Sequence, residues 1–373
     1  MKRITLRVFL ILFFLLGTLQ PLFSLARILL YGGLFEYNFT YLRAAEAALV
    51  GKSIYSFGDI NYPPLALFLF IPFHFLPVFW GQIVWSIISL SCLLLALYLS
   101  FRVLGIGWKW NNLSLILPLT LLAFPTKWTF GLGQINNAIL LLMVLGFFFY
   151  QKDRFALSGL SLGVATSLKI VPGALLLYFL VKKKFKIFVS GIITVITLFL
   201  LSGLVFGFNL VGEYFTKVVP ATLGIGGKYT YYNQAASGFF SRVINNGNNA
   251  ATATIIFSLL ILVVTLYLLL RQKEVDAFGY SLIISTILLI NSFSWQHHFV
   301  WLLFPFLVFL KASPYKGILF ISYLLVAFNI KRPELLMSSF FDKILLSHVF
   351  LGNFLLWLLL VFLISRKGEK ILH

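Results

Sequence analysis

The chain has 373 residues, of which 61% are hydrophobic and only 10% are charged, and its formal net charge is +19. An apolar fraction this large excludes an ordinary water-soluble domain and indicates a membrane protein. A strongly positive charge would suggest a nucleic-acid partner in a soluble protein. Here the basic residues lie at the ends of apolar runs, so we expect no nucleic acid as a partner.

Apolar runs recur along the whole chain, and several are shorter than the roughly 20 residues that cross a bilayer core. Because backbone in lipid must satisfy its own hydrogen bonds, we predict one all-α polytopic membrane domain over residues 1–373, with about 11 to 12 transmembrane helices. The runs cover residues 8–31, 62–78, 83–104, 113–126, 135–150, 156–182, 187–207, 251–271, 277–293, 299–310, 315–330 and 346–365.

The basic stretches give the orientation. Cytoplasmic loops are enriched in Lys and Arg, so the amino terminus and the later basic stretches are assigned to the cytoplasm. The first apolar run has no small-residue cleavage site and is read as a retained helix. It delivers a first outer loop, 32–61, and a second long outer loop follows at 208–250. The basic stretches are "MKR" (1–3), "VKKKFK" (181–186), "RQKEVD" (271–276) and "SRKGEK" (365–370).

The topology of one stretch stays open, and another stretch is expected to lie on the membrane surface. Five ordinary crossings between 62 and 186 would place "QKDR" (151–154) outside, whereas its charge favours the inside and requires one re-entrant segment. Residues 37–50 are mildly amphipathic and are expected to form a helix on the membrane surface.

An intramembrane lysine is the least ordinary feature. Lys169, Pro172 and Gly173 interrupt the run 156–182, so we predict a broken helix there. A lysine inside a membrane is costly unless it meets an anion, a carbonyl or water, although snorkelling to the interface is an alternative.

The outer segments carry groups suited to group transfer. Glu36, Asp59, His297 and His298 offer a carboxylate or an imidazole, the usual bases for a hydroxyl proton. Each also has a plainer interpretation. Glu36 suits a solvated loop acid, Asp59 suits a cap for the helix opened by Pro63, and the histidines lie where an interfacial aromatic belt is expected.

Seven short motifs follow one another along the chain: the acid loop at Glu36, "GKSIY", "YPPLALFL", "GQINNAILLL", "SLKIVPGALLLYFLVKKKFK", "NQAASGFFSR" and "SWQHHFVWLL". In this order they resemble the bacterial glycosyltransferase family 87, which comprises polyprenyl-phosphate-sugar-dependent transferases of the GT-C class. The resemblance implies a GT-C fold with outer-face juxtamembrane helices and inverting transfer of mannose, or a related hexose, to a lipid-linked or cell-surface glycan. Two positions depart from the family pattern: Glu36 stands where an Asp is more frequent, and Gln296 where an acid precedes the histidine.

With this resemblance the candidate residues receive roles. Glu36, or else Asp59, would accept the proton of the acceptor hydroxyl, and Lys169, Arg242 and Arg27 would neutralise the carrier phosphate. Amides donate and accept hydrogen bonds, which suits sugar hydroxyls. The residues expected to bind donor or acceptor are Tyr62, Gln134, Asn136, Asn233, Gln234, His297 and His298.

The expected partners are a polyprenyl-phosphate-sugar donor, a lipid-linked or glycan acceptor and membrane lipids. No cofactor is expected, and the scarcity of outer acids argues against a metal cage. The resemblance implies a multi-pass protein of the bacterial inner membrane with its site on the periplasmic face. A transporter or flippase for a lipid-linked saccharide, and an inactive scaffold for glycan assembly, are the alternatives.

Overall fold

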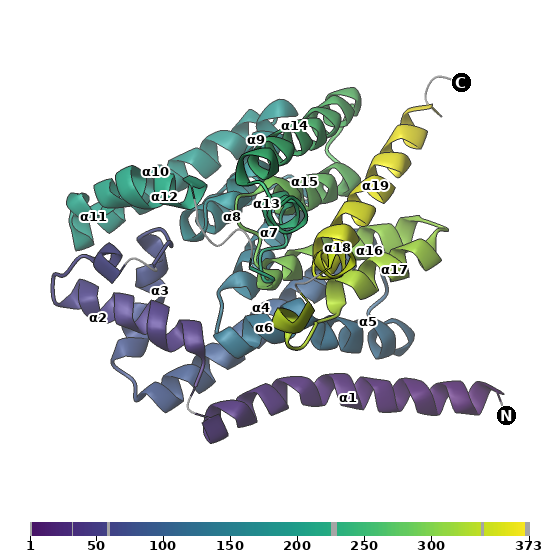
Figure 1. Ribbon diagram of the computed structural model, residues 1–373, viewed down its shortest axis with the longest axis horizontal. Helices are drawn as coiled ribbons and strands as arrows, with labels where there is room; N and C mark the ends of the chain where they lie inside the picture. Colours follow the sequence, from purple (N-terminus) through teal and green to yellow (C-terminus); the bar gives the residue numbers. More distant parts are fainter. Residues whose placement is uncertain (1, 32, 58–59, 225–229, 337–338, 370–373) are drawn as a thin grey trace.

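The computed structural model describes residues 2–31, 33–57, 60–224, 230–336 and 339–369 (Figure 1). Within these ranges the chain folds almost entirely into helices and contains no β-strand; one isolated bridge joins Asn233 and Trp295. The all-α prediction is confirmed. The helices are α1 Lys2–Tyr31, η1 Tyr37–Leu42, α2 Arg43–Leu49, η2 Ile54–Phe57, α3 Leu65–His74, α4 Val78–Leu104, α5 Trp110–Leu122, α6 Phe124–Leu132, α7 Asn136–Gln151, α8 Phe155–Leu168, η3 Val171–Gly173, α9 Ala174–Val181, α10 Phe185–Phe206, α11 Phe208–Glu213, η4 Tyr214–Val218, α12 Val219–Gly224, α13 Ala236–Val243, α14 Gly247–Arg271, α15 Ala277–Ile290, η5 Gln296–Leu302, α16 Leu303–Ala312, α17 Lys316–Ala327, η6 Pro333–Leu336, α18 Phe340–Leu345 and α19 His348–Glu369.

Only some helices reach full membrane length. Among the described residues, α4, α10, α14 and α19 are long and apolar enough to cross a membrane, and α5 with α6 would be a fifth span bent by 56°. Other apolar helices, such as α7, α8 and α15, have 10–17 residues. The predicted count of 11 to 12 crossings therefore stays a prediction, because many apolar runs fold into helices shorter than a full crossing.

The structure separates the two alternatives for residues 62–186. The Tyr150 ring at the end of α7 lies 6.2 Å from Phe155, where α8 begins, and 5.3 Å from Phe179, near the end of α9. The chain therefore runs out along α8, turns at Lys169–Gly173 and returns along α9 to the same end. The predicted break is confirmed, and 151–154 lies at the same end as "VKKKFK", as its charge indicates.

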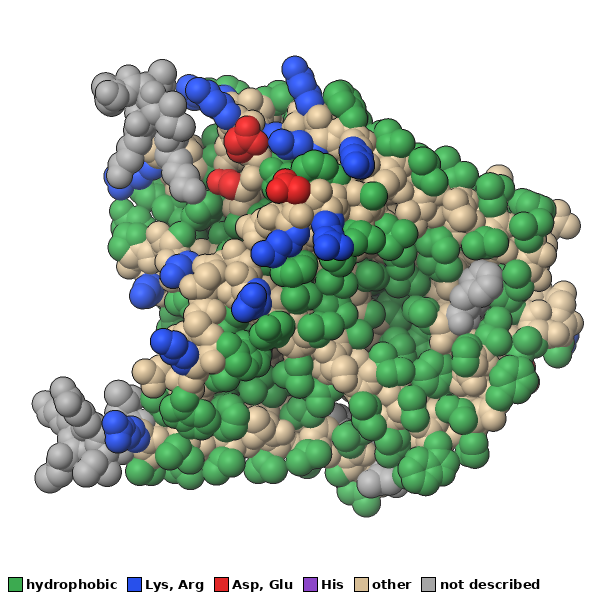
Figure 2. All heavy atoms as spheres, turned by 180° about the vertical axis from the view of Figure 1, so that it is seen from behind, with side chains coloured by type: hydrophobic (Ala, Val, Ile, Leu, Met, Phe, Trp, Pro, Cys, Tyr) green, Lys and Arg blue, Asp and Glu red, His purple; other side chains and the backbone are tan. Residues whose placement is uncertain are grey.

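The basic stretches and the short outer helices lie at opposite ends of the molecule. Figure 2 shows Lys and Arg side chains gathered toward the end where both termini lie. The short helices α2, α3, α11 and α12 lie at the other end (Figure 1). This is the charge asymmetry that the positive-inside rule predicts for a membrane protein.

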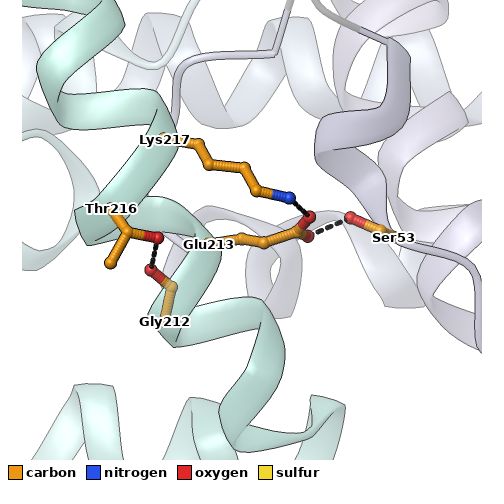
Figure 3. Close-up of polar contacts among 5 residues, drawn as sticks. All are labelled: Ser53, Gly212, Glu213, Thr216 and Lys217. Atoms are coloured by element: carbon orange, nitrogen blue, oxygen red, sulfur yellow. Dashed lines mark hydrogen bonds and ion pairs between the residues drawn. The ribbon is translucent and has the colours of Figure 1, made fainter.

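The two predicted outer loops are largely helical and contact each other. Ser53 of the first segment donates a hydrogen bond to the Glu213 carboxylate of the second, and Lys217 Nζ lies 2.7 Å from the same carboxylate (Figure 3). These hydrogen bonds, chiefly that from Lys217, hold the pKa of Glu213 below its ordinary value. The Tyr55 and Tyr214 rings pack beside them at 6.0 Å. We call this contact the loop latch: Ser53, Tyr55, Glu213, Tyr214 and Lys217.

Candidate active site

A cavity of about 500 Å³ lies where the two outer segments meet the turn between α8 and α9 and the residues around η5. Elements more than 250 residues apart in sequence contribute to its wall, as Glu36 and His298 show. Six of the predicted site residues line this cavity: Glu36, Tyr62, Gln134, Lys169, His297 and His298.

Lys169 reaches the cavity from the tip of the α8–α9 hairpin. Its Nζ lies 2.5 Å from Nε2 of His298 and 3.4 Å from Oδ1 of Asn136. The rings of Tyr62 and Trp301 lie 5.4 and 5.9 Å away, within the range of a cation–π contact. When Lys169 is an ammonium group, which only donates, Nε2 of His298 is the acceptor and the imidazole is neutral with its proton on Nδ1.

Glu36 lies half-buried at the start of the π-helix η1. Its Oε2 accepts a hydrogen bond of 2.8 Å from Thr40 Oγ1, one turn further along. Lys169 and Tyr62 are both close enough to interact with its charge. Among the described residues that line the cavity, Glu36 is the one carboxylate, so it is the acid available there as a base.

The Gln134 amide is oriented by two tyrosines. Its Oε1 accepts hydrogen bonds from the hydroxyls of Tyr62, at 2.8 Å, and Tyr41, at 3.1 Å. The preceding Gly133 ends α6 with φ +74°, and a Cβ there would lie 2.8 Å from Cβ of Tyr37, so this turn requires glycine. Because the oxygen is occupied, the NH₂ of Gln134 is the group left to donate to a ligand.

Four predicted residues do not line the cavity. Asn136 lies behind Lys169 and is fully buried. Arg242 is only 5% exposed and donates to the carbonyls of Thr230 and Asn233 and to Ser347 Oγ. Its predicted contact with the carrier phosphate is therefore not what the geometry provides, because its donors are used inside the protein.

Asn233 and Gln234 are likewise buried, and their side-chain amides form hydrogen bonds with backbone groups. The Gln234 Nε2 donates to the carbonyls of Tyr231 and Leu346, and its Oε1 accepts from the Phe350 N–H. Gln234 N–H also donates to the Ser294 carbonyl at 2.8 Å. The two amides predicted to bind sugar instead fix the segment before α13 against the segment before η5.

Two further predicted residues fall outside what the structure describes: Asp59 lies outside the described ranges, and the side chain of Arg27 is not described.

Four aromatic residues that line the cavity were not among the predicted site residues. Trp128, Tyr232, Phe293 and Trp295 all line it. The available signal was proximity to motifs, since Tyr232 directly precedes "NQAASGFFSR" and Trp295 lies within "SWQHHFVWLL". Tyr232 and Trp295 are assigned to the cavity only once the two segments are seen to pair.

Comparison with known proteins gives the family. The model of glycosyltransferase family 87 matches residues 61–292, more than half of the chain, and the chain belongs to this family. The resemblance carried by the motifs is thereby confirmed. The matched range includes Tyr62, Gln134 and Lys169 but not Glu36 or the histidine pair.

Named relatives have similar sequences. A polyprenol-phosphate-mannose-dependent alpha-(1-2)-phosphatidylinositol pentamannoside mannosyltransferase of Mycobacterium tuberculosis is 27% identical over 68% of this chain and 58% of its own length. Its namesake in Mycolicibacterium smegmatis is 26% identical over 69% of this chain and 62% of its own. The chain thus spans about three fifths of these relatives. The crystal structure of ArnT from Cupriavidus metallidurans bound to undecaprenyl phosphate aligns with a TM-score of 0.41 at 13% identity, over 97% of this chain and 77% of ArnT.

Proposed function

We propose that this protein is an integral-membrane glycosyltransferase of the GT-C class that uses a polyprenyl-phosphate-linked hexose such as mannose. It transfers the sugar to a lipid-linked or cell-surface glycan, with inversion at the anomeric carbon. The observation that carries the proposal is the single cavity in which the Glu36 carboxylate lies near the Lys169–His298 pair. The names of the relatives, which are mannosyltransferases dependent on polyprenol-phosphate-mannose, support the donor.

The cavity supplies both halves of a displacement reaction. The bond between the anomeric carbon and the phosphate oxygen breaks while the acceptor oxygen bonds to the opposite face of that carbon, which inverts its configuration. Glu36 takes the hydroxyl proton of the acceptor, and Lys169 offsets the charge that develops on the departing polyprenyl phosphate. His298 fixes the position of Lys169 Nζ through their contact of 2.5 Å. Because the sugar arrives on its lipid carrier, the proposal needs no cofactor.

Charge distribution supports an outer-face site. Residues of both predicted outer segments line the cavity. Their helices α2, α11 and α12 lie at the end of the molecule opposite both termini (Figure 1). Cytoplasmic loops are the ones enriched in Lys and Arg. We therefore assign the site to the periplasmic face of a bacterial inner membrane.

The test is transfer by the purified protein. Wild-type protein in nanodiscs, given polyprenyl-phosphate-[¹⁴C]mannose and membrane lipids, is expected to label an acceptor. Glu36→Gln should lower turnover by about 100-fold or more, the usual contribution of a general base. The control is Glu46→Gln, because Glu46 is an exposed acid of the same outer segment that does not line the cavity.

Other outcomes would identify a different base or a different function. Near-normal turnover of Glu36→Gln would move the base to another residue, with Asp59 the next candidate. Movement of the labelled lipid between leaflets without transfer would identify a flippase. If the wild-type protein neither transfers the sugar nor moves the lipid between leaflets, the remaining alternative is an inactive scaffold for glycan assembly.

A further inference from the structure

One wall of the cavity is aromatic and has no role in the chemistry proposed above. Trp128 comes from α6, Tyr232 precedes α13 and Trp295 precedes η5; we call these three residues the aromatic corner. The Trp128 and Tyr232 ring centroids are 4.2 Å apart with an interplanar angle of 88°. Trp295 lies 6.4 Å from Tyr232, and Phe293 stacks on Trp295 at 5.8 Å. The edge of the Trp128 or Tyr232 ring therefore meets the face of the other, and these two rings form a right angle in the cavity wall.

These rings differ from an interfacial aromatic belt. A belt explains side chains on the surface that faces lipid head groups. Trp80, near the start of α4, fits that description because it is 58% exposed and does not line the cavity. Tyr232 is 37% exposed, Trp128 and Trp295 are half-buried, and all three line the same cavity as Lys169. Their rings are accessible from the cavity, so a ligand is the partner to consider.

The aromatic corner is held in place by backbone pairing. The Gln296 N–H donates to the Tyr232 carbonyl at 3.0 Å, and the Gln234 N–H donates to the Ser294 carbonyl. Arg242 fixes the same segment from behind by donating to the carbonyls of Thr230 and Asn233. A preorganised surface loses little freedom when a ligand packs on it, which is what a binding site requires.

The chemistry of the wall selects a class of ligand. A pyranose ring presents C–H groups on its faces and hydroxyls around its rim. It therefore matches a flat aromatic surface bordered by hydrogen-bonding groups, whereas a phosphate needs only the polar part and an alkyl chain only the apolar part. The Trp128 ring lies 6.5 Å from that of His297, so polar groups border the aromatic corner.

We propose that the aromatic corner binds a pyranose of the acceptor, which makes the preferred acceptor a glycan and not an unglycosylated lipid head group. This inference rests on the proposed function, because Lys169, positioned by His298, then binds the donor phosphate and the aromatic corner is left for the second substrate. It adds a specificity-determining surface to a cavity whose charged residues account for the chemistry alone.

The experiment compares two soluble acceptors that share an alkyl chain. Full-length protein in nanodiscs receives polyprenyl-phosphate-[¹⁴C]mannose with either octyl α-D-mannopyranoside or 1-O-octylglycerol, which has hydroxyls but no ring. Wild type should prefer the mannoside. Tyr232→Ala should raise KM for the mannoside by about tenfold, equivalent to about 1.4 kcal/mol, while KM for the donor changes little.

Further variants test whether the rise in KM comes from loss of the aromatic ring or from a change in the fold. Tyr232→Phe keeps the aromatic face and should restore the wild-type KM, and Trp80→Ala should behave like wild type. If Tyr232→Ala does not fold, Trp295→Leu provides the same test on the adjacent ring and should also raise KM for the mannoside about tenfold.

The outcomes distinguish this inference from the proposed function. An unchanged acceptor KM with normal donor hydrolysis would overturn the pyranose site alone. A rise in donor KM instead would also overturn the pyranose site alone. Equal use of the two acceptors by wild type would overturn both the pyranose site and the glycan acceptor of the proposed function. A wild-type protein that neither transfers nor hydrolyses the donor overturns the proposed function, and the acceptor inference with it.

Discussion

Lys169 combines a structural cost with a functional position. A cation at membrane depth is expensive, and its partners among the described residues are an imidazole nitrogen, an amide oxygen and two aromatic rings. These groups are neutral, whereas the Glu36 carboxylate of the same cavity is close enough to interact with the charge of Lys169. A lysine on a cavity wall whose direct contacts are with neutral groups is suited to bind a phosphate.

We predict that Lys169→Met raises KM for the polyprenyl-phosphate-mannose donor by about 10- to 100-fold, the range of a hydrogen bond to a charged group. The reason is loss of a cation that offsets the phosphate charge. Initial rates at varied donor concentration give the value, and Lys52→Met, an exposed lysine of the first outer segment, is the control. Unchanged donor KM would remove Lys169 from the phosphate site.

Arg242 leads to the opposite prediction. Its guanidinium is buried and donates to two carbonyls and a hydroxyl, so Arg242→Met should lower the thermal stability of the purified protein, by about 1–3 kcal/mol for groups left unpaired. Donor KM, measured well below the melting temperature, should change little. Arg242→Lys should recover part of the stability. A raised donor KM with unchanged stability would restore the role that the sequence suggested.

The comparison of Lys169 with Arg242 shows which site residues can be predicted from the sequence. Lys169 was recognised because a lysine within an apolar run is costly wherever the chain folds. The surroundings of Arg242 depend on Ser347, which is 105 residues away, and on loop carbonyls that have no sequence signature. The same limit hid the aromatic corner, whose residues become neighbours only in the fold.

At the scale of elements, Pro63 and Pro64 lead into α3, and both are buried. The adjacent Tyr62 uses its carbonyl to accept from Tyr55 and its hydroxyl to donate to Gln134. A sharp start to α3 therefore sets the position of a cavity wall, because proline fixes the backbone at the first turn of a helix.

We predict that the double substitution Pro63→Ala, Pro64→Ala lowers transfer several-fold without blocking membrane insertion, because the backbone at Tyr62 gains freedom. Labelled transfer per mole of membrane-inserted protein measures the effect. Pro314→Ala, at an exposed turn after α16, is the control. Full activity of the double variant would show that the prolines only begin a helix.

The loop latch predicts a pH dependence. The folded pKa of Glu213 lies below its ordinary value of 4.5, so its ionised form is favoured by folding. The stabilisation is complete above about pH 4.5 and is lost as the pH falls through the lowered pKa. Because the carboxylate is partly exposed, the contribution is expected to be small, about 0.5–1 kcal/mol.

Hydrogen exchange of backbone amides can measure how much the loop latch stabilises α11 and η4. Protection of α11 and η4 should fall on acidification in the wild type, and Glu213→Gln should show the reduced protection at pH 7 with no further acid-dependent change. Ser53→Ala should give a smaller loss at pH 7, because the contact with Lys217 remains. Equal protection in all variants at every pH would mean that the loop latch does not hold the outer segments together.

The hairpin of α8 and α9 marks the limit of prediction for elements. Proline and glycine after Lys169 predict a break, and the structure has one. The sequence left the return of α9 open: a run of 27 residues is long enough to cross a membrane even when broken, whereas the charge of residues 151–154 favours a re-entrant segment. Contacts of Tyr150 with both Phe155 and Phe179 determine the direction.

For the whole molecule, the hairpin determines which ends of the helices share a side. With α8 and α9 turning back, 151–154 joins the other basic stretches, and the cavity lies at the opposite end with both outer segments. Composition and charge gave most of this arrangement in advance. The short helices are the part that hydropathy could not assign, because their length fits a partial crossing as well as a full one.

Cysteine labelling tests this arrangement, since the chain has one cysteine, Cys92, which Cys92→Ser removes. In that background Lys52→Cys should react with a membrane-impermeant maleimide on intact spheroplasts, because Lys52 is exposed in the first outer segment. Lys152→Cys should react only after permeabilisation, because the turn between α7 and α8 lies at the basic end. Reaction of both in intact cells would restore five ordinary crossings, and reaction of Lys152→Cys alone would invert the protein and place the cavity in the cytoplasm.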